Sequence, residues 1–299
     1  MIRSAAWETV GTNHRTKSLS EAFKAYDLDY EVAVSPICGY NQSGDKIEIP
    51  KKVLTYRTDT LQPFGIVSDK YPVIQNSEAL NFIENVIQDA DMELINGGHT
   101  SWGSFYLIGQ LPEMTILNDS IRPHLIFQSS HDGSVPLKAT ICMLRLACQN
   151  QFARSFNESP ATIKILHRGD TEAKIKTASE TLSGVYGYLK TYQSEVERMS
   201  KIRITPAKFN QIVEGYFKIP DEASARTEQK ILERREEMRA AYESDDNQNL
   251  KGTMWGVINA FTDYNTHRTM KNLEARFLDS INPEGTVDNF CSYVENVVH

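Results

Sequence analysis

The chain has 299 residues, of which 40% are hydrophobic and 24% charged, and its formal net charge is −7 at pH 7. This composition is typical of a globular protein with a sizeable hydrophobic core, and it excludes disordered and fibrous chains. No apolar run approaches the ~18 residues of a membrane-spanning helix, and residues 1–17 lack the apolar segment of a signal peptide. The four cysteines are scattered without CxxC pairs, which favours reduced thiols. We therefore expect a cytoplasmic protein without membrane contact.

The first part of the chain has the pattern of strands followed by one helix. Residues 1–29 are polar and are expected to form a loosely attached N-terminal arm. From residue 30 to 75, apolar and polar residues alternate, which predicts strands, with a turn at 41–46. A helix is then predicted to begin at a cap at Asn76 or Ser77. Its apolar residues have the spacing i, i+3, i+4, i+7 and are Ala79, Leu80, Ile83, Val86 and Ile87.

A second group of strands follows this helix. The strands are predicted in MELINGG, SWGSFYLIGQLP, HLIFQSSHDGS and LKATICMLRLACQ, at residues 92–98, 101–112, 124–134 and 137–149. Gly97-Gly98 and Asp132-Gly133 are predicted as hairpin turns, and a bend is expected near Gly103. The resulting order β–β–β–α–β–β–β predicts an α+β fold, in which an antiparallel sheet packs on helices.

The last part of the chain is predicted to be helical. Its longest helix carries a heptad seam, in which apolar residues alternate at spacings of three and four from Ile175 to Met199. Such a seam needs a partner surface, and we favour the chain's own sheet over another subunit. Shorter helices are expected at residues 206–220, 221–246 and 253–276. The predicted organisation is an N-terminal arm, an α+β core domain and a helical C-terminal region, at residues 1–29, 30–203 and 204–299.

Several common catalytic signatures are missing from the sequence. It contains no GxxxxGK[ST] phosphate loop, no GxGxxG after a strand, no HExxH and no GxSxG. Nucleotide hydrolysis, zinc proteolysis and hydrolase-fold catalysis therefore lack support. We expect no cofactor, and the sequence favours a binding protein over an enzyme.

Three groups of residues have both a chemical and a structural interpretation. His131 and Asp132 have the chemistry of a metal site or a catalytic base, but Asp-Gly is also ordinary hairpin chemistry, which we favour. Cys148 needs a neighbouring base to act as a nucleophile, and a buried structural thiol is the favoured interpretation. Asp263 and His267 lie one helical turn apart, but two ligands on one helix do not make a metal site. A buried polar network is favoured there.

Positive charge is concentrated in the middle of the chain. Residues 131–220 contain 13 basic and 8 acidic residues, a net charge of +5, whereas each flanking part carries a net charge of −6. Aromatic residues lie between these cations, at Phe152, Phe156, Tyr186, Tyr188 and Tyr192. Cations that bind phosphates and rings that stack on bases are the features of a single-stranded nucleic acid site. An ordinary solvated helix face is an equal alternative.

A set of ordered segments resembles a known family. The segments are FGIVSDKYPVIQNSEAL, WGSFYLIGQLP, SSHDGSVPLKA, LRLACQNQ, ILHRGDTEAKI and GTMWGVINAFTDYNTHR. From about Leu61 to Arg268 the chain resembles phage- and plasmid-like proteins that share a domain of unknown function. The resemblance implies a mobile-element origin and a location in the host cytoplasm. The element order beside a basic segment is also similar to that of Rad52-type annealing proteins, which bind single strands in a basic groove as rings or filaments.

These features predict a single-stranded DNA-binding protein of a phage or plasmid. It would promote strand annealing or recombination as an ATP-independent homo-oligomer, a ring or filament, with a nuclease or a single-strand-binding protein as a candidate partner. The expected nucleic-acid contacts are Lys51, Lys52, Arg57, Lys138, Arg145, Gln149, Asn150, Arg154, Lys164 and Arg168. One alternative is a metal-dependent enzyme acting on nucleic acid, with the candidate ligands His131, Asp132, Asp263 and His267. The other is an interaction module that blocks host defence through the heptad seam.

Overall fold

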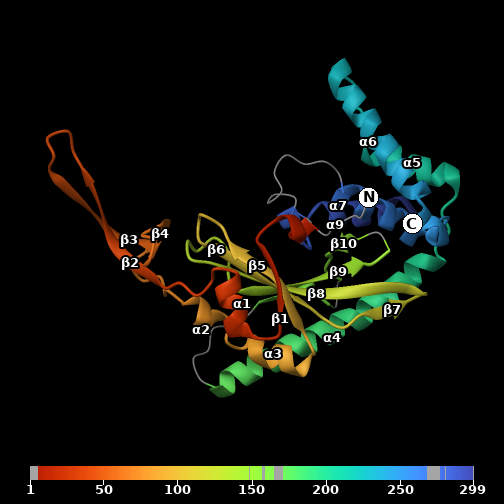
Figure 1. Ribbon diagram of the computed structural model, residues 1–299. Helices are drawn as coiled ribbons and strands as arrows, with labels where there is room; N and C mark the ends of the chain where they lie inside the picture. Colours follow the sequence, from red (N-terminus) through yellow and green to blue (C-terminus); the bar gives the residue numbers. More distant parts are fainter. Residues whose placement is uncertain are drawn as a thin grey trace.

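The computed structural model describes residues 6–147, 149–156, 159–164, 171–267, 277–279 and 281–298. The fold is α+β, as predicted. Antiparallel sheets form the N-terminal half and helices form the C-terminal region (Figure 1). The described strands make one large sheet and a separate three-stranded sheet.

The large sheet has the strand order β1-β5-β6-β8-β9-β10, with β7 paired to β8 and β11 paired to β9. Its strands are β1 (Thr12–Thr16), β5 (Glu93–His99), β6 (Ser104–Gln110), β7 (Met114–Ile116), β8 (Asp119–Ser130), β9 (Lys138–Arg145), β10 (Asn150–Phe152) and β11 (Thr162–Lys164). Strand β8 pairs with β6 and with β9 without a register shift. It is therefore the regular centre of the sheet, and side chains opposite one another on these strands share a face.

Helices pack on one face of the large sheet and form the C-terminal region. They are α1 (Leu19–Ala25), α2 (Asn76–Leu80), α3 (Ile83–Asp89), α4 (Thr171–Lys201), α5 (Pro206–Tyr216), α6 (Ala225–Glu243), α7 (Met254–His267) and α9 (Thr286–Val298), with short 3-10 helices at Ala6–Thr9 and Asp245–Leu250. The single helix predicted after Asn76 is two short helices, α2 and α3. No described helix is long and apolar enough to span a membrane.

Strict alternation gives the large sheet two apolar faces. Leu125 and Ile141 belong to the main core, which α1, α3 and α4 also enter. Ile126, the next residue along β8, belongs to a smaller cluster on the other face that contains Trp7 and Phe277. Both faces are therefore covered, but the second one by short segments from the two ends of the chain.

The three-stranded sheet projects from the body of the molecule (Figure 1). Its strands, in the order β2-β3-β4, are β2 (Val32–Tyr40), β3 (Lys46–Arg57) and β4 (Pro63–Ser68). The turn predicted at 41–46 joins β2 to β3. There the Asn41 Oδ1 atom accepts hydrogen bonds from the amides of Ser43 and Asp45, and Gly44 has a φ of +86°. Local turn chemistry thus places the tip of the hairpin, as expected from the sequence.

The N-terminal residues do not form the loosely attached arm that we expected. Strand β1 is the edge strand of the large sheet, paired with β5, and the Trp7 side chain is only 1% exposed. The Tyr26 hydroxyl donates to the carbonyl of His14, and Leu28 is fully buried. The sequence of this segment is mostly polar because an edge strand exposes most of its side chains. A few widely spaced apolar residues hold the segment on the body of the protein.

The predicted Gly97-Gly98 turn is wrong, because both residues lie inside strand β5. A Cβ atom on Gly97 would come within 2.5 Å of the Tyr26 ring, so a small residue is needed for packing rather than for a turn. The chain reverses at Thr100–Gly103, where Gly103 has a φ of +78°. The second predicted turn is confirmed between β8 and β9, where Gly133 has a φ of +79°.

The heptad seam is buried within the chain itself, as we favoured. In the described part of the seam, the side chains that are at most 7% exposed are Ala178, Leu182, Val185, Tyr192, Val196 and Met199. Helix α4 packs on α3, α7 and β7. The described part of the seam is therefore core and is covered by the chain itself, which counts against a host-defence module that acts through it.

Candidate nucleic-acid interface

Cross-strand register places four polar side chains in one row across the large sheet. Tyr106 on β6 is opposite Gln128 on β8, Gln128 is opposite Lys138 on β9, and Lys138 is opposite Lys164 on β11. Directly opposed residues have Cβ atoms about 4.5–5.5 Å apart and share a face. Two of the lysines predicted to bind phosphate are therefore immediate neighbours, next to an amide and an aromatic ring.

A cavity of about 660 Å³ lies over the same end of this face. Residues on β6 and β8 line it from the sheet, and the two turns at 99–102 and 132–135 line it together with short segments from both ends of the chain. The lining residues are Val10, Gly11, His99, Thr100, Ser101, Trp102, Ser104, Phe105, Tyr106, Gln128, Ser129, Asp132, Ser134, Val135, Phe277 and Leu278. The cavity thus combines aromatic rings with hydroxyl, amide and carboxylate groups.

The turn before β6 presents an indole ring at this cavity. The Trp102 side chain is 71% exposed although it lines the cavity. The Thr100 hydroxyl accepts hydrogen bonds from the amides of Trp102 and Ser104, at 3.3 and 3.2 Å, which holds the turn. The Gln62 Nε2 atom donates to the carbonyl of Ser101 from the connection between β3 and β4, at 2.9 Å. An exposed aromatic ring on a fixed turn is a suitable platform for a stacking ligand.

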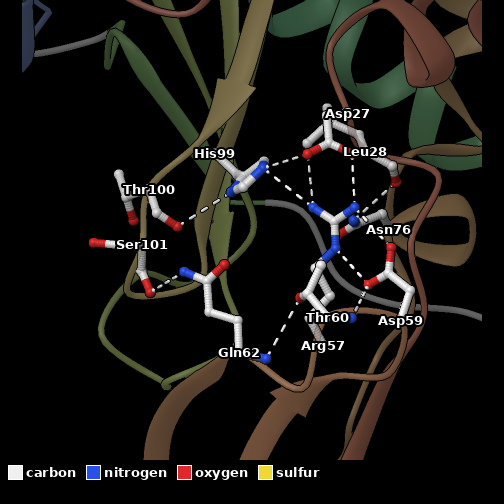
Figure 2. Close-up of polar contacts among 10 residues, drawn as sticks. All are labelled: Asp27, Leu28, Arg57, Asp59, Thr60, Gln62, Asn76, His99, Thr100 and Ser101. Atoms are coloured by element: carbon white, nitrogen blue, oxygen red, sulfur yellow. Dashed lines mark hydrogen bonds and ion pairs between the residues drawn. The ribbon is translucent and has the colours of Figure 1, made fainter.

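Figure 2 shows the polar network behind the cavity. The guanidinium of Arg57 donates two hydrogen bonds to Asp27, both at 2.7 Å, and two to Asp59, at 2.7 and 2.9 Å. It also lies 4.4 Å from the centre of the Tyr30 ring. The hydrogen bonds from Arg57 are the main reason why the pKa of Asp27 is lowered to about 2. The charge of Arg57 is thus already compensated, which counts against its predicted role as a phosphate ligand.

His99 connects this network to the cavity. Its Nε2 atom lies 2.9 Å from Asp27 Oδ2, and its Nδ1 atom lies 3.3 Å from the carbonyl of Thr100 (Figure 2). Both ring nitrogens therefore face oxygen acceptors of the protein. The arrangement orients the ring at the cavity wall and leaves neither nitrogen open to act as a general base on a ligand.

His131 is a buried structural residue. Its ring is 3% exposed and stacks between Phe64 and Phe105, at centroid distances of 5.5 and 5.2 Å. Its Nε2 atom lies 2.9 Å from Asn76 Oδ1. Burial lowers the pKa of this imidazole to about 4. The ring joins the projecting sheet to the large one, and the next residue, Asp132, accepts hydrogen bonds from Ser134 within the hairpin turn.

The four candidate metal ligands do not come together. His267 and Asp263 are 3.6 Å apart on α7, where Thr266 accepts a hydrogen bond from the amide of Gln151 on β10. Strand β9 pairs with both β10 and β8, and this pairing aligns Gln151 on β10 with Arg122 on β8. Arg122 lies nine residues before His131 in the sequence. At about 3.3 Å per residue, the two pairs are roughly 30 Å apart. In the part of the chain that the structure describes, no three His, Cys, Asp or Glu residues are grouped to hold a metal ion.

Two of the predicted phosphate ligands are buried in ion pairs at the far end of the sheet. Arg145 is bonded to Asp119, and Arg154 donates to Asp288 at 2.9 Å and to Glu295 at 2.8 Å. Each arginine is 8% exposed. They join the strands to one another and to α9, and their charges are directed into the protein.

The amides next to them have similar structural partners. The side chain of Gln149 donates to the carbonyl of Leu146, and that of Asn150 donates to the carbonyl of Asn259 on α7. Arg168 and Cys148 lie outside the described residues. Asn150 therefore fixes the end of the sheet on helix α7, whereas Gln149 closes the turn before β10. Both amides have the structural role at a strand end that the sequence offered as the alternative to nucleic-acid contacts.

The remaining predicted cations face solvent. Lys51 and Lys52 are exposed on β3, and Lys164 is exposed beside the partly buried Lys138. Sequence reasoning did not assign Trp102 or Gln128 to the site. The Ser-Trp-Gly sequence is a usable signal for the first, because turns lie at the protein surface and an indole ring on a turn is easily left exposed.

One comparison with known proteins gives a match. The model of a family described as a domain of unknown function, DUF932, matches residues 63–284, more than half of the chain. The matched span includes β4 to β11 and α2 to α7, and so contains the cavity turns and the row of side chains. No curated protein and no solved structure matches the chain.

Proposed function

The chain belongs to the DUF932 family, and we propose that it binds single-stranded DNA along the row formed by Tyr106, Gln128, Lys138 and Lys164. The single observation that carries the proposal is the cross-strand pairing of the two lysines beside an aromatic cavity. Adjacent ammonium groups attract successive phosphates, and exposed rings accept bases by stacking.

The geometry favours single strands over a duplex. The exposed ring of Trp102 and the aromatic side chains of the cavity offer π-faces, which only unpaired bases can stack on. Base stacking does not depend on sequence, so the proposed activity is general strand binding that leaves other bases free to pair. Annealing or recombination without ATP is the reaction that such binding supports.

The proposal includes a homo-oligomer, a ring or filament of identical copies. The β2–β3 hairpin extends away from the body (Figure 1), and Tyr40, Ile47 and Ile49 on it are 70%, 53% and 44% exposed. A two-stranded ribbon is only marginally stable alone in water. The hairpin also carries Lys51 and Lys52, whereas the whole chain has a net charge of −7. These two positive charges on the hairpin are therefore complementary to the net negative charge of a second copy. Sedimentation velocity tests this, and a monomer at DNA-binding concentrations would remove the oligomer from the proposal.

The biological setting is also part of the proposal. The quoted sequence segments suggest a phage or plasmid protein that acts in the host cytoplasm, with the layout of Rad52-type annealing proteins. A nuclease or a single-strand-binding protein of the same element is the expected partner. Acceleration of annealing between two complementary strands, in the absence of nucleotide, is the activity to be measured.

The decisive experiment is fluorescence anisotropy of a labelled single strand of about 40 nucleotides at several salt concentrations. Each phosphate neutralised on a single strand contributes about −0.7 to the slope of log K against log salt. The double variant Lys138→Ala/Lys164→Ala should therefore bind more weakly, with a slope shallower by about 1.4. The matched control is Lys230→Ala/Arg234→Ala, which removes two exposed charges from α6 and should keep the wild-type slope.

Two results would contradict the proposal. Absence of binding at low salt would exclude strand binding altogether. An unchanged slope in the Lys138/Lys164 double variant would exclude this row as the site of the phosphates.

A further inference from the structure

We propose that the cavity beside the lysine row receives one unstacked base of a nucleotide, whose phosphate lies on Lys138 and Lys164. This inference rests on the proposed function and gives it a specific contact. A general electrostatic surface needs no cavity, whereas a base pocket fixes the position of one nucleotide and so sets the register of the strand.

The lining residues have the chemistry that a nucleobase requires. Trp102 and Tyr106 supply aromatic surface, and Gln128 supplies an amide that both donates and accepts hydrogen bonds. The hydroxyl of Ser104, on the same face of β6 as Tyr106, adds a further donor and acceptor. Flat apolar surface combined with a few donor and acceptor groups is how proteins read an extruded base.

The charges near the cavity agree with the polarity of a nucleotide. Lys138 stands directly beside Gln128, which lines the cavity, and Lys164 follows one strand further out. Neighbouring strands are about 4.8 Å apart, so cationic groups begin where the cavity ends. An uncharged aromatic ligand would gain nothing from these two lysines, and a simple anion would gain nothing from the rings. A nucleotide uses both.

The size of the cavity is also suitable. Its volume of about 660 Å³ is within the range of roughly 300–1,000 Å³ for pockets that hold small ligands. The turn before β6 is fixed by the hydrogen bond that the Thr100 hydroxyl accepts, by the one that Gln62 donates, and by the close approach of Gly103 to Phe64. The pocket is therefore formed before the ligand arrives, which keeps the entropic cost of binding low.

The three tryptophans give a direct readout of base insertion. Trp102 is 71% exposed, whereas Trp7 and Trp255 are 1% and 3% exposed. Quenching by acrylamide therefore reports mainly on Trp102. The wild-type protein would be titrated with a single strand of about 40 nucleotides, with the same strand made wholly of abasic sites, and with free nucleoside 5′-monophosphates. The normal strand should quench Trp102 emission and protect it from acrylamide, and the abasic strand should not.

Variants test the contact itself. Trp102→Ala should bind the normal strand at least about fivefold more weakly, the lower limit for loss of one base–aromatic stack, and should bind the abasic strand like the wild-type protein. Leu232→Ala is the matched control, because this apolar side chain is 44% exposed on α6, outside the cavity lining. It should bind both strands like the wild-type protein.

The outcomes separate this inference from the proposed function. If the strand binds with a steep salt dependence but Trp102 emission does not change, or if the abasic strand binds equally well, the base pocket is refuted and strand binding stands. If free nucleotides quench Trp102 but no strand binds, the pocket stands and the strand-binding proposal fails. If neither ligand binds, both are refuted.

Discussion

Replacing His131 by Gln is expected to make the protein less sensitive to acid. The imidazole is 3% exposed at the junction of the two sheets, and burial lowers its pKa from 6.5 to about 4. The folded protein therefore keeps this ring neutral at pH values where the unfolded chain protonates it. The amide of Gln retains a donor for the Asn76 side-chain oxygen that lies 2.9 Å from Nε2 in the native protein, but it takes up no proton.

The size of the effect follows from the two pKa values. Because the unfolded state binds more protons between pH 6.5 and 4, the free energy of unfolding falls as the pH is lowered through this window. With pKa values of 6.5 unfolded and about 4 folded, His131 alone lowers the free energy of unfolding by about 2 kcal/mol between pH 7.5 and 5.0. Below pH 4 both states carry the proton, and the total loss levels off at about 3 kcal/mol.

Urea unfolding at pH 7.5 and 5.0 measures this difference. Wild-type protein should lose about 2 kcal/mol more than His131→Gln between the two pH values. His124 is a useful comparison, because burial lowers its pKa to about 3 and its ring lies seven residues earlier on β8. Between pH 7.5 and 5.0, the His124→Gln variant should likewise lose about 2 kcal/mol less free energy of unfolding than the wild-type protein. Equal pH dependence in wild-type protein and His131→Gln would refute the reasoning.

Two further predictions concern packing and ion pairs. Gly97→Ala should lower the free energy of unfolding by about 1–3 kcal/mol, the usual cost of overpacking, because the new Cβ atom would come within 2.5 Å of the Tyr26 ring. Gly39→Ala, where nothing lies within 4 Å, is its control and should unfold like wild-type protein in thermal denaturation. Arg154→Met leaves two carboxylates, 29% and 27% exposed, without their buried partner. Because these carboxylates are partly hydrated, the free energy of unfolding should fall by about 2–3 kcal/mol, less than for a fully buried broken pair. The slope of log K against log salt for DNA binding should not change. A shallower slope would show that Arg154 belongs to the binding surface.

The sequence by itself determined the elements that depend on local patterns. The hairpin tip at 41–46 follows from the turn chemistry of Asn41 and Gly44, and α5 begins at Pro206 as predicted. The heptad seam identified the buried side of α4. These features were predictable because the residues that decide them are within one or two turns of one another.

Only the tertiary structure decided which residues meet at the candidate site. Lys138 and Lys164 are 26 positions apart in sequence and become neighbours through the register of β9 and β11. Arg57 and Arg154 looked equivalent to them, yet both are paired with carboxylates from distant segments. The burial and partners of a charged side chain depend on long-range packing, which periodicity does not encode. For the same reason, the prediction of a loose arm at residues 1–29 is wrong, because this part of the chain includes β1, the edge strand of the large sheet.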